Sequence, residues 1–434
     1  MIIYKNNKKE ESYFSEEEIF DLCEDSLKKS GLTNKRVLCI IPDTTRSGPT
    51  DFLFKTVSKI LSGFTKKTDF IIALGTHPQM EKEKIYGFLS INEDEKRTIY
   101  KNTDIFQHQW DNPEQLKSLG IISKDEISEI SNGLLSEDIP VTINKKVFDY
   151  DEILTLGPVF PHEVVGFSGG YKYLFPGISG PEFLHRFHWL GALITNTGIN
   201  GFKDTPVRQT INKAVSLINI PIINMCYVVR DKKIAGFYIG DNSAWSEAAD
   251  FSACINIKYV EKPFRTVLSI SPKMYEELWT AGKCMYKLEP VVENNGTLII
   301  YAPHIKEVSV MHGKYIKQIG YHTRDYFLKQ MDKFKDIPGG TLAHSTHVKG
   351  LGTFENGIEK PRVNVVLATG ISEEECRKIN LDYIDYRKIN IEDYKNKEEQ
   401  GILVVENAGE ILYQECLYHN RYISRIFHIP WTRI

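Results

Sequence analysis

Short apolar runs alternate with longer amphipathic stretches along the chain, and this alternation predicts an α/β fold. Three apolar runs in the first half predict buried strands, and each is followed by a polar loop. They span residues 36–42, 68–74 and 152–156. Because ligands of open parallel sheets bind at the carboxyl ends of the strands, the three loops predict one shared crevice.

A second unit is predicted to begin near residue 263, where a new series of apolar runs starts. A helix is expected from Lys273 to about Tyr286, and the pattern is mostly helical between 306 and 335. The expected strands of this unit are 266–270, 296–301, 363–368 and 401–405. We therefore predict two α/β domains with Rossmann-like sheets and an active-site cleft between them. The domains are 1–262 and 263–434, with the last residues free to pack back on the first domain.

Composition narrows the classes of function. The 434 residues include 54 Lys and Arg against 57 Asp and Glu, and this balance disfavours a general nucleic-acid binder, which needs a basic surplus. No apolar run reaches about 18 residues, and the N-terminus has no signal-peptide core. The seven cysteines are scattered without a Cys-x-x-Cys pair, which is typical of reduced thiols. We expect a cytoplasmic protein with no membrane or nucleic-acid partner.

A glycine-rich stretch at residues 166–172 ends in Lys172. Closely spaced glycines let the backbone approach a ligand, and their N–H groups can cradle an anion. The spacing matches neither the phosphate loop of nucleotide hydrolases nor the dinucleotide-binding fingerprint. Taken alone, the stretch is equally typical of a tight structural turn.

Twelve histidines provide candidate ligands and proton carriers. Two pairs have His-x-x-His spacing, which places both rings on one helix face and makes each pair a candidate metal site, although surface and core roles are commoner. His77 and His162 each follow a predicted strand in a loop with Gly and Pro, where an imidazole can serve as acid or base near neutral pH. A lone loop histidine is still more often structural. The pairs are His185 with His188, and His344 with His347.

Two further polar segments are candidates for the crevice. Residues 43–46, Asp-Thr-Thr-Arg, precede a predicted helix and are equally able to cap it, whereas Arg46 in a crevice needs a carboxylate or phosphate partner. Residues 346–350 predict either a crevice loop facing the first unit or a solvated loop.

Together these motifs resemble those of the nickel-pincer nucleotide-dependent lactate racemase family. The resemblance is close over most of the first 260 residues and looser beyond. The matching segments occur in the same order as in the family: Asp43-Thr44-Thr45-Arg46, Gly75-Thr76-His77, Pro161-His162, Gly166-Phe167-Ser168-Gly169-Gly170-Tyr171-Lys172, Pro176-Gly177 and His188.

The resemblance implies a cofactor, the pyridinium-3-thioamide-5-thiocarboxylic acid mononucleotide with Ni(II). It implies that Lys172 holds this nucleotide covalently and that His188 is the protein ligand of a square-planar nickel. Separate biosynthetic proteins make the cofactor, so they are implied partners, and a recombinant sample can lack it. The resemblance places four more residues at the cofactor: Thr45, Ser168, Gly169 and Gly170.

The resemblance also implies an isomerase, a racemase or epimerase that inverts a hydroxyl-bearing carbon of a hydroxy acid by hydride transfer. His77 and His162 match the family's two acid/base residues. Arg46 is expected to pair with the substrate anion or the charge at the reacting oxygen, and Asp43 to orient a neighbour.

One departure concerns the substrate. Lactate-specific members bind the carboxylate with a Gln and a Lys three residues apart, and here Glu276 and Trp279 are expected at those positions. A carboxylate accepts hydrogen bonds from hydroxyls and repels another carboxylate, so a larger substrate such as a sugar acid is predicted instead of lactate. Lys283 or Lys349 is the alternative carboxylate partner, and His347 is a further candidate contact.

Two other classes of function remain open. A metal-dependent hydrolase or lyase would use His162, His185 and His188 and would leave Lys172 dispensable. A non-catalytic protein whose two α/β domains close on a small anion would tolerate replacement of His77 and His162.

Overall fold

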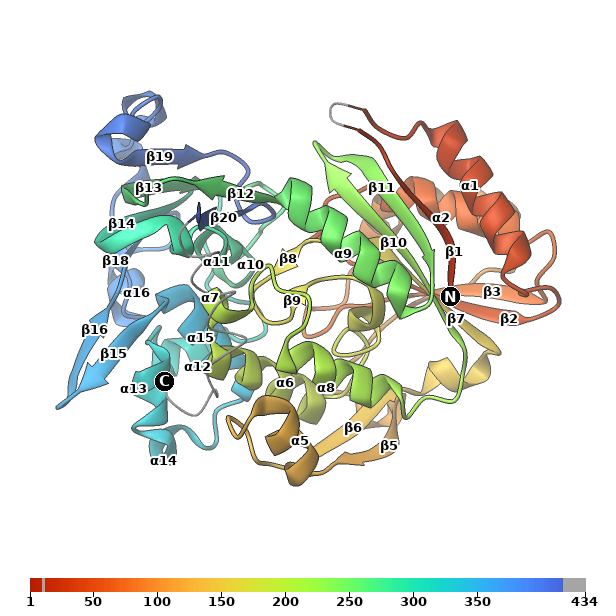
Figure 1. Ribbon diagram of the computed structural model, residues 1–434, viewed down its shortest axis with the longest axis horizontal. Coiled ribbons are helices and arrows are strands. Elements are labelled where there is room, and N and C mark those ends of the chain that lie inside the picture. Colours follow the sequence, from red (N-terminus) through yellow and green to blue (C-terminus); the bar gives the residue numbers. More distant parts are fainter. Residues whose placement is uncertain (10–11, 417–434) are drawn as a thin grey trace.

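The computed structural model describes residues 1–9 and 12–416, and it contains two main sheets with helices around them (Figure 1). The predicted α/β fold is confirmed. The larger sheet has the strand order β1-β11-β10-β7-β2-β3-β4, in which the five strands from β10 to β4 are mutually parallel. Its strands are β1 (Ile2–Asn7), β2 (Arg36–Ile41), β3 (Lys67–Ile72), β4 (Ile105–Gln107), β7 (Glu152–Pro158), β10 (Ile222–Arg230) and β11 (Lys233–Gly240).

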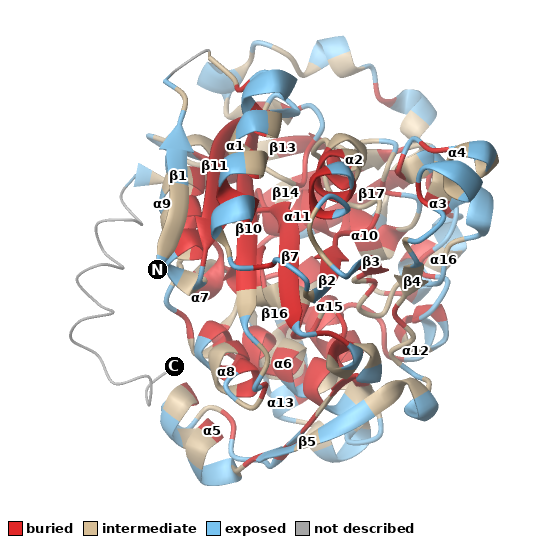
Figure 2. Cartoon of the chain, turned by 90° about the vertical axis from the view of Figure 1, so that its right-hand side faces the viewer, coloured by how far each residue is buried: buried red, intermediate tan, exposed pale blue. Residues whose placement is uncertain are grey.

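The central strands of this sheet are apolar because both of their faces are covered. In β2, Leu38 and Ile40 join one core cluster, whereas Val37, Cys39 and Ile41 join the cluster on the opposite face. Figure 2 shows β7 and β10 buried between the flanking helices. The helices of this half are α1 (Glu16–Lys29), α2 (Thr50–Leu61), α3 (Lys82–Phe88), α4 (Glu93–Thr98), α5 (Lys124–Ser131), α6 (Pro181–Ile194), α7 (Asn196–Ile199), α8 (Pro206–Val215) and α9 (Asn242–Asn256).

The smaller sheet has five parallel strands in the order β18-β17-β14-β13-β19. Four of its strands confirm the predicted apolar runs of the second unit. They are β13 (Phe264–Ile270), β14 (Val292–Ala302), β17 (Asn364–Thr369), β18 (Asp382–Tyr383) and β19 (Ile402–Val405). The helices of this half are α10 (Leu278–Ala281), α11 (Lys283–Tyr286), α12 (Gly313–Ile319), α13 (Arg324–Leu328), α14 (Met331–Phe334), α15 (Gly339–Lys349) and α16 (Glu373–Lys378).

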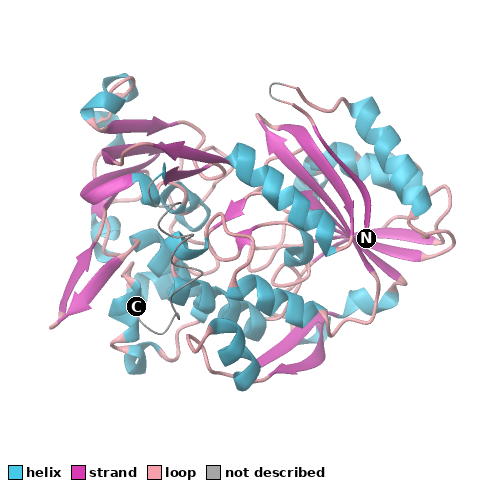
Figure 3. Ribbon diagram, in the orientation of Figure 1, coloured by secondary structure: helices cyan, strands magenta, loops and turns pink. Residues whose placement is uncertain are grey.

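Of the short two-stranded sheets, β8–β9 lies among loops between the two main sheets, whereas β5–β6 and β15–β16 lie at the edges of the molecule (Figures 1 and 3). The pairing of β12 with β20 brings the end of the described chain back beside α9 and the first half. The predicted boundary at 262/263 falls between β12 and β13 and stays a prediction. The expected return of the last residues falls largely on 417–434, outside the described residues. The short strands are β5 (Leu116–Ile122), β6 (Ile139–Asn144), β8 (Pro161–His162), β9 (Gly166–Phe167), β12 (Ile257–Val260), β15 (Gly352–Glu355), β16 (Ile358–Pro361) and β20 (Leu412–Glu415).

Two local predictions in the second half are wrong. The expected helix from Lys273 to Tyr286 begins only at Leu278, because the N–H groups of Leu278 and Trp279 bond to the carbonyls of Glu307 and Val308. These long-range bonds override local helix propensity. The segment 346–350, expected as a loop, is instead the last turn of α15 and its terminating glycine. Across the described ranges, no helix is long and apolar enough to cross a bilayer.

Candidate active site

A pocket lies where the two halves of the molecule meet. From the first half it is lined by the loops after β2, β3 and β7, by the glycine-rich stretch and by α6, as the three strand-end loops predict. From the second half it is lined by α10, α11, α15 and the residue before α12. We call these two sides the first wall and the second wall. Seven of the twelve histidines line the pocket: His77, His162, His185, His188, His312, His344 and His347.

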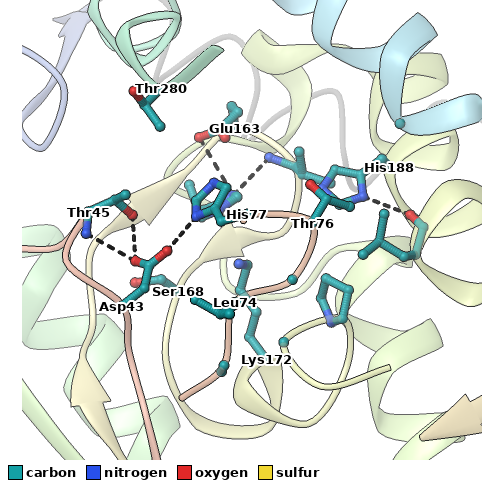
Figure 4. A pocket seen from close by; sticks show the side chains of 18 of the residues that line it. Asp43, Thr45, Leu74, Thr76, His77, Glu163, Ser168, Lys172, His188 and Thr280 are labelled. Carbon is teal, nitrogen blue, oxygen red and sulfur yellow. Dashed lines mark hydrogen bonds and ion pairs between the residues drawn. The ribbon is translucent and has the colours of Figure 1, made fainter. Parts of the chain in front are cut away.

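On the first wall, Nδ1 of His77 is hydrogen-bonded to Oδ2 of Asp43 (Figure 4). The other carboxylate oxygen of Asp43 accepts from the backbone N–H and the hydroxyl of Thr45, at 3.0 and 2.7 Å. Burial alone raises the pKa of Asp43, but the His77 ring and the Thr45 donors outweigh it and hold that pKa well below its usual range. Asp43 is therefore an ionised orienting group, and the Nε2 atom of His77 is left for the pocket.

His162 lies on β8 and is only 6% exposed. Its Nδ1 atom accepts the backbone N–H of Val164 at 3.1 Å, and a carboxylate oxygen of Glu163 lies 3.6 Å from the same nitrogen. Burial, reinforced by the nearby cations of Lys172 and Arg46, lowers the pKa of His162 well below its usual value. The ring is therefore neutral at physiological pH.

His188 projects into the pocket from α6. Its Nδ1 atom bonds to the backbone carbonyl of Leu184 at 2.7 Å, one turn earlier in the helix (Figure 4). A carbonyl oxygen only accepts, so Nδ1 carries the hydrogen and Nε2 has a free lone pair. Burial lowers the pKa of His188 to about 3, which keeps that lone pair available. This is the arrangement that fixes the ring of a metal-binding histidine.

Lys172 belongs to the short 3-10 helix η3 (Gly170–Tyr173), and its side chain points into the pocket (Figure 4). Within the described part of the chain, its Nζ atom has no hydrogen-bond or ion-pair partner. Burial and the positive charge of Arg46 lower the pKa of Lys172 to about 7. About half of this amine is therefore uncharged at neutral pH, which makes it nucleophilic.

The glycine-rich stretch is held tightly by its neighbours. Gly169 and Gly170 have φ angles of 80° and 58°, and a Cβ atom on Gly170 would lie 2.8 Å from the Trp245 ring. The Ser168 hydroxyl accepts from the backbone of Phe160 and donates to a backbone carbonyl, so it braces the loop. Gly169 and Ser168 still line the pocket.

Two more cations line the pocket from opposite sides. Arg46 reaches it from the first wall, and among the described residues no carboxylate lies within ion-pairing distance of its guanidinium. Lys283 reaches it from α11 and donates to the backbone carbonyl of Thr45 at 3.2 Å. Burial, followed by repulsion from Arg46, lowers the pKa of Lys283 to about 7.

The second wall is built from aromatic rings. Trp279 stacks on His344, with ring centroids 3.9 Å apart, and on His312, at 4.2 Å. His347 lies one turn after His344 on α15 and contacts the Tyr286 ring. Four ring nitrogens are buried without a hydrogen-bond partner in the described structure: Nε2 of His312, Nδ1 of His344 and both nitrogens of His347.

Two predicted contacts lie outside the pocket. Glu276 precedes α10, its side chain is 71% exposed, and it pairs with Lys84 at 3.0 Å. Lys349 donates to the carbonyl of Asn380. The later start of α10 moves the inward-facing positions by one turn, so that Thr280 and Lys283 line the pocket three residues apart. The other predicted residues, including Trp279 and His347, line it or adjoin it.

Several pocket residues were missed by the sequence reasoning. Glu163 adjoins His162 in sequence. Thr280 lies three residues before Lys283, the same separation as between Glu276 and Trp279, which were expected in these two positions. His344 shares a helix face with His347, a signal that was noted only as a metal pair. His312 had no sequence signal. Between the described residues, no group of three or more His, Cys, Asp or Glu side chains is arranged to hold a metal ion by itself, so His162, His185 and His188 do not form a three-ligand site.

The chain is similar in sequence to lactate racemases. Residues 3–199 match the family model described as the lactate racemase N-terminal domain. A lactate racemase from Lactiplantibacillus plantarum is 22% identical over 289 residues, and one from Thermoanaerobacterium thermosaccharolyticum is 23% identical over 282 residues. These matches cover 64% and 62% of this chain. The chain spans only 62% and 60% of the length of those two relatives.

Two solved structures share the fold over nearly the whole chain. A protein from Thermotoga maritima superposes with a TM-score of 0.86 at 32% identity, covering 94% of this chain and 100% of that one. The lactate racemase apoprotein from Thermoanaerobacterium thermosaccharolyticum superposes with a TM-score of 0.69 at 18% identity, covering 93% and 94%. The two-sheet architecture is therefore common to all three proteins.

Proposed function

We propose that the chain, whose residues 3–199 match the family model of the lactate racemase N-terminal domain, is an isomerase that racemises or epimerises a hydroxy acid. The reaction takes place in the pocket between the two walls. One observation carries the proposal: a lysine amine without a partner, a histidine with a bare Nε2 and a carboxylate-oriented histidine all meet in one pocket.

The residues of the pocket fit a covalently held nickel-pincer nucleotide. Lys172 presents an amine without a partner to the pocket, as a covalent attachment point requires, and His188 offers one neutral nitrogen to a metal. When bound, this cofactor supplies a pyridinium ring that takes up and returns a hydride. No group of the described side chains would hold nickel by itself, so the nucleotide would supply the ligands other than His188. We also propose the proteins that make this nucleotide as partners, because the family resemblance implies that separate proteins supply it.

The chain's own residues bind the substrate and move its proton. Arg46 presents a positive charge from the first wall and Lys283 an amine that can donate hydrogen bonds from the second, and both suit the carboxylate of a hydroxy acid. His77, oriented by Asp43, accepts the hydroxyl proton. His162, the second of the two expected acid/base residues, contacts the reacting oxygen. The pocket buries these groups, so hydrogen bonds and charges act there more strongly than in water.

We propose a sugar acid or another polyhydroxylated acid as the substrate. Glu276, on which the sequence argument depended, is exposed and supplies no support. The support comes instead from the second wall, where His312, His344 and His347 stay neutral because burial lowers the pKa values of all three to about 3–4. Neutral imidazoles both donate to and accept from hydroxyl groups, which lactate lacks beyond its reacting carbon.

The test is intact-protein mass spectrometry with nickel analysis after co-expression with the cofactor-making proteins. We expect a covalent mass increase with near-stoichiometric nickel in the wild type and none in Lys172→Ala. Lys283→Ala is the matched control, because Lys283 lies in the same pocket with the same lowered pKa, and this variant should keep the mass increase. Unmodified wild-type protein, under conditions that load a known lactate racemase, would refute the proposal.

A further inference from the structure

His77 and His162, the two expected acid/base residues, are anchored by opposite kinds of hydrogen-bond partner. His77 uses Nδ1 to contact the Asp43 carboxylate, which is ionised and can only accept a hydrogen bond. His162 uses the same ring atom to contact the backbone N–H of Val164, which can only donate. Each partner therefore dictates where the single hydrogen of a neutral ring lies.

We infer that the two histidines are preset in opposite tautomers: His77 presents a bare Nε2 that accepts a proton, whereas His162 presents an Nε2–H that donates a hydrogen bond. This inference rests on the proposed function for its chemical meaning, but the tautomers follow from the anchors alone. It gives two residues of the same type unequal roles in the resting enzyme.

The proton balance explains why the roles differ. When the substrate O–H bond breaks, its proton forms a bond to Nε2 of His77, and the resulting imidazolium is stabilised by Asp43. The electron pair left on oxygen would form the carbonyl, and the nucleotide of the proposed function, when bound, would supply the acceptor for the hydride leaving the carbon. His162 keeps its own hydrogen throughout this step, because losing it would leave an imidazolate. In this tautomer it stabilises the oxygen as a donor and is not a base.

Glu163 is the group that allows His162 to become a base. For that, Nδ1 must carry the hydrogen, and the contact with Val164 must be replaced by an acceptor. A carboxylate oxygen of Glu163 lies 3.6 Å from Nδ1, just beyond hydrogen-bond distance, and Nζ of Lys287 lies 4.0 Å from the same oxygen. We therefore assign Glu163 as a positioning residue that selects the second tautomer when the other epimer is processed.

The test is ¹⁵N NMR of the full-length protein labelled in its histidines, without cofactor and near neutral pH. Protonated and bare ring nitrogens have well-separated ¹⁵N shifts, and His77→Gln and His162→Gln identify each ring's signals by their loss. We expect His77 to carry its hydrogen on Nδ1 and His162 on Nε2. The same tautomer in both rings, or the reverse assignment, would overturn the inference.

Two variants check the cause. In Asp43→Asn the amide NH₂ can donate to Nδ1, so His77 should switch to the Nε2–H tautomer. In Glu163→Gln the Val164 anchor remains, so the His162 signals should stay in the wild-type pattern; a tautomer change there would contradict the assignment. The NMR experiment uses no substrate or cofactor, so it is independent of activity. A loaded enzyme without activity would refute the proposed function but not the tautomer assignment. The wrong tautomers would refute the assignment but not the proposed function.

Discussion

The two walls of the pocket use the same residue type in opposite ways. On the first wall, His77, His162 and His188 each have Nδ1 anchored by a partner close in the fold. On the second wall, His312, His344 and His347 are buried, and four of their six ring nitrogens have no partner in the described structure, although Nε2 of His344 is anchored to the carbonyl of Trp279 at 3.0 Å. An anchored ring has a defined tautomer and direction before any ligand arrives, which suits proton transfer and metal binding. An unpartnered buried nitrogen costs free energy until a ligand satisfies it, which suits recognition.

Asp43→Asn is the variant that should damage the first wall most. It keeps the shape of the anchor but reverses its hydrogen-bonding role, so Nε2 of His77 no longer accepts a proton. By analogy with the aspartate of a Ser-His-Asp triad, we expect kcat of the loaded enzyme to fall about 10⁴-fold. Steady-state kinetics measures the loss, and Asp151→Asn, an exposed carboxylate paired with Arg36, is the control. A loss below about tenfold would mean that Asp43 does not orient the base.

Lys172 offers the next largest effect, on chemical reactivity. Its pKa of about 7, lowered from 10.5, increases the uncharged fraction at pH 7 about a thousandfold relative to an ordinary lysine. The sign follows from burial, which disfavours the ammonium, so the neutral amine predominates above pH 7. Limited acetylation of cofactor-free protein between pH 6 and 9, read by peptide mass spectrometry, should give a midpoint near pH 7 at Lys172.

The exposed Lys84 is the internal reference for this titration. In Arg46→Met, removal of the nearby positive charge should move the Lys172 midpoint to higher pH. An unchanged midpoint in that variant would show that burial alone causes the shift.

His347→Phe tests the second wall, and it should move stability and recognition in opposite directions. The substitution removes two unpartnered nitrogens, so the free energy of unfolding of the empty protein should rise by about 1 kcal/mol. Recognition of hydroxyls should weaken, with kcat/KM for a hexonate falling about tenfold while that for 2-hydroxyhexanoate, which has the same chain length, stays constant. Denaturant titration and kinetics on both acids check the two halves. Equal losses of kcat/KM for both acids would show that His347 does not bind the additional hydroxyls.

Glu276→Gln should have the smallest effect. The side chain is exposed and its ion pair with Lys84 is a surface pair, for which contributions of about 0–1 kcal/mol are typical. We expect kcat/KM to stay within about twofold for every acid tested. A change in the preference between the two acids would indicate that Glu276 contacts the substrate.

Much of the first wall was predictable from sequence because its residues lie next to their strands. Asp43, His77 and His162 come within five residues of the ends of β2, β3 and β7, and a parallel sheet brings the ends of such strands together. Lys172 and His188 each lie within one short helix, so their positions relative to the neighbouring motif residues follow from local structure. Apolar runs predicted the strands of both sheets, since central strands of parallel sheets are apolar on both faces.

The second wall was decided by tertiary structure. Bonds from Leu278 and Trp279 to residues 307 and 308 delay the start of α10, and this moves Glu276 out of the pocket and Thr280 into it. His312 and His344 come from separate segments and meet only by stacking on Trp279. The sequence by itself thus determined the strands and the loops that carry the proposed chemistry, because both depend on neighbours along the chain. Only the tertiary structure decided which side chains face that chemistry across the pocket, because helix starts and ring stacking depend on contacts between distant segments.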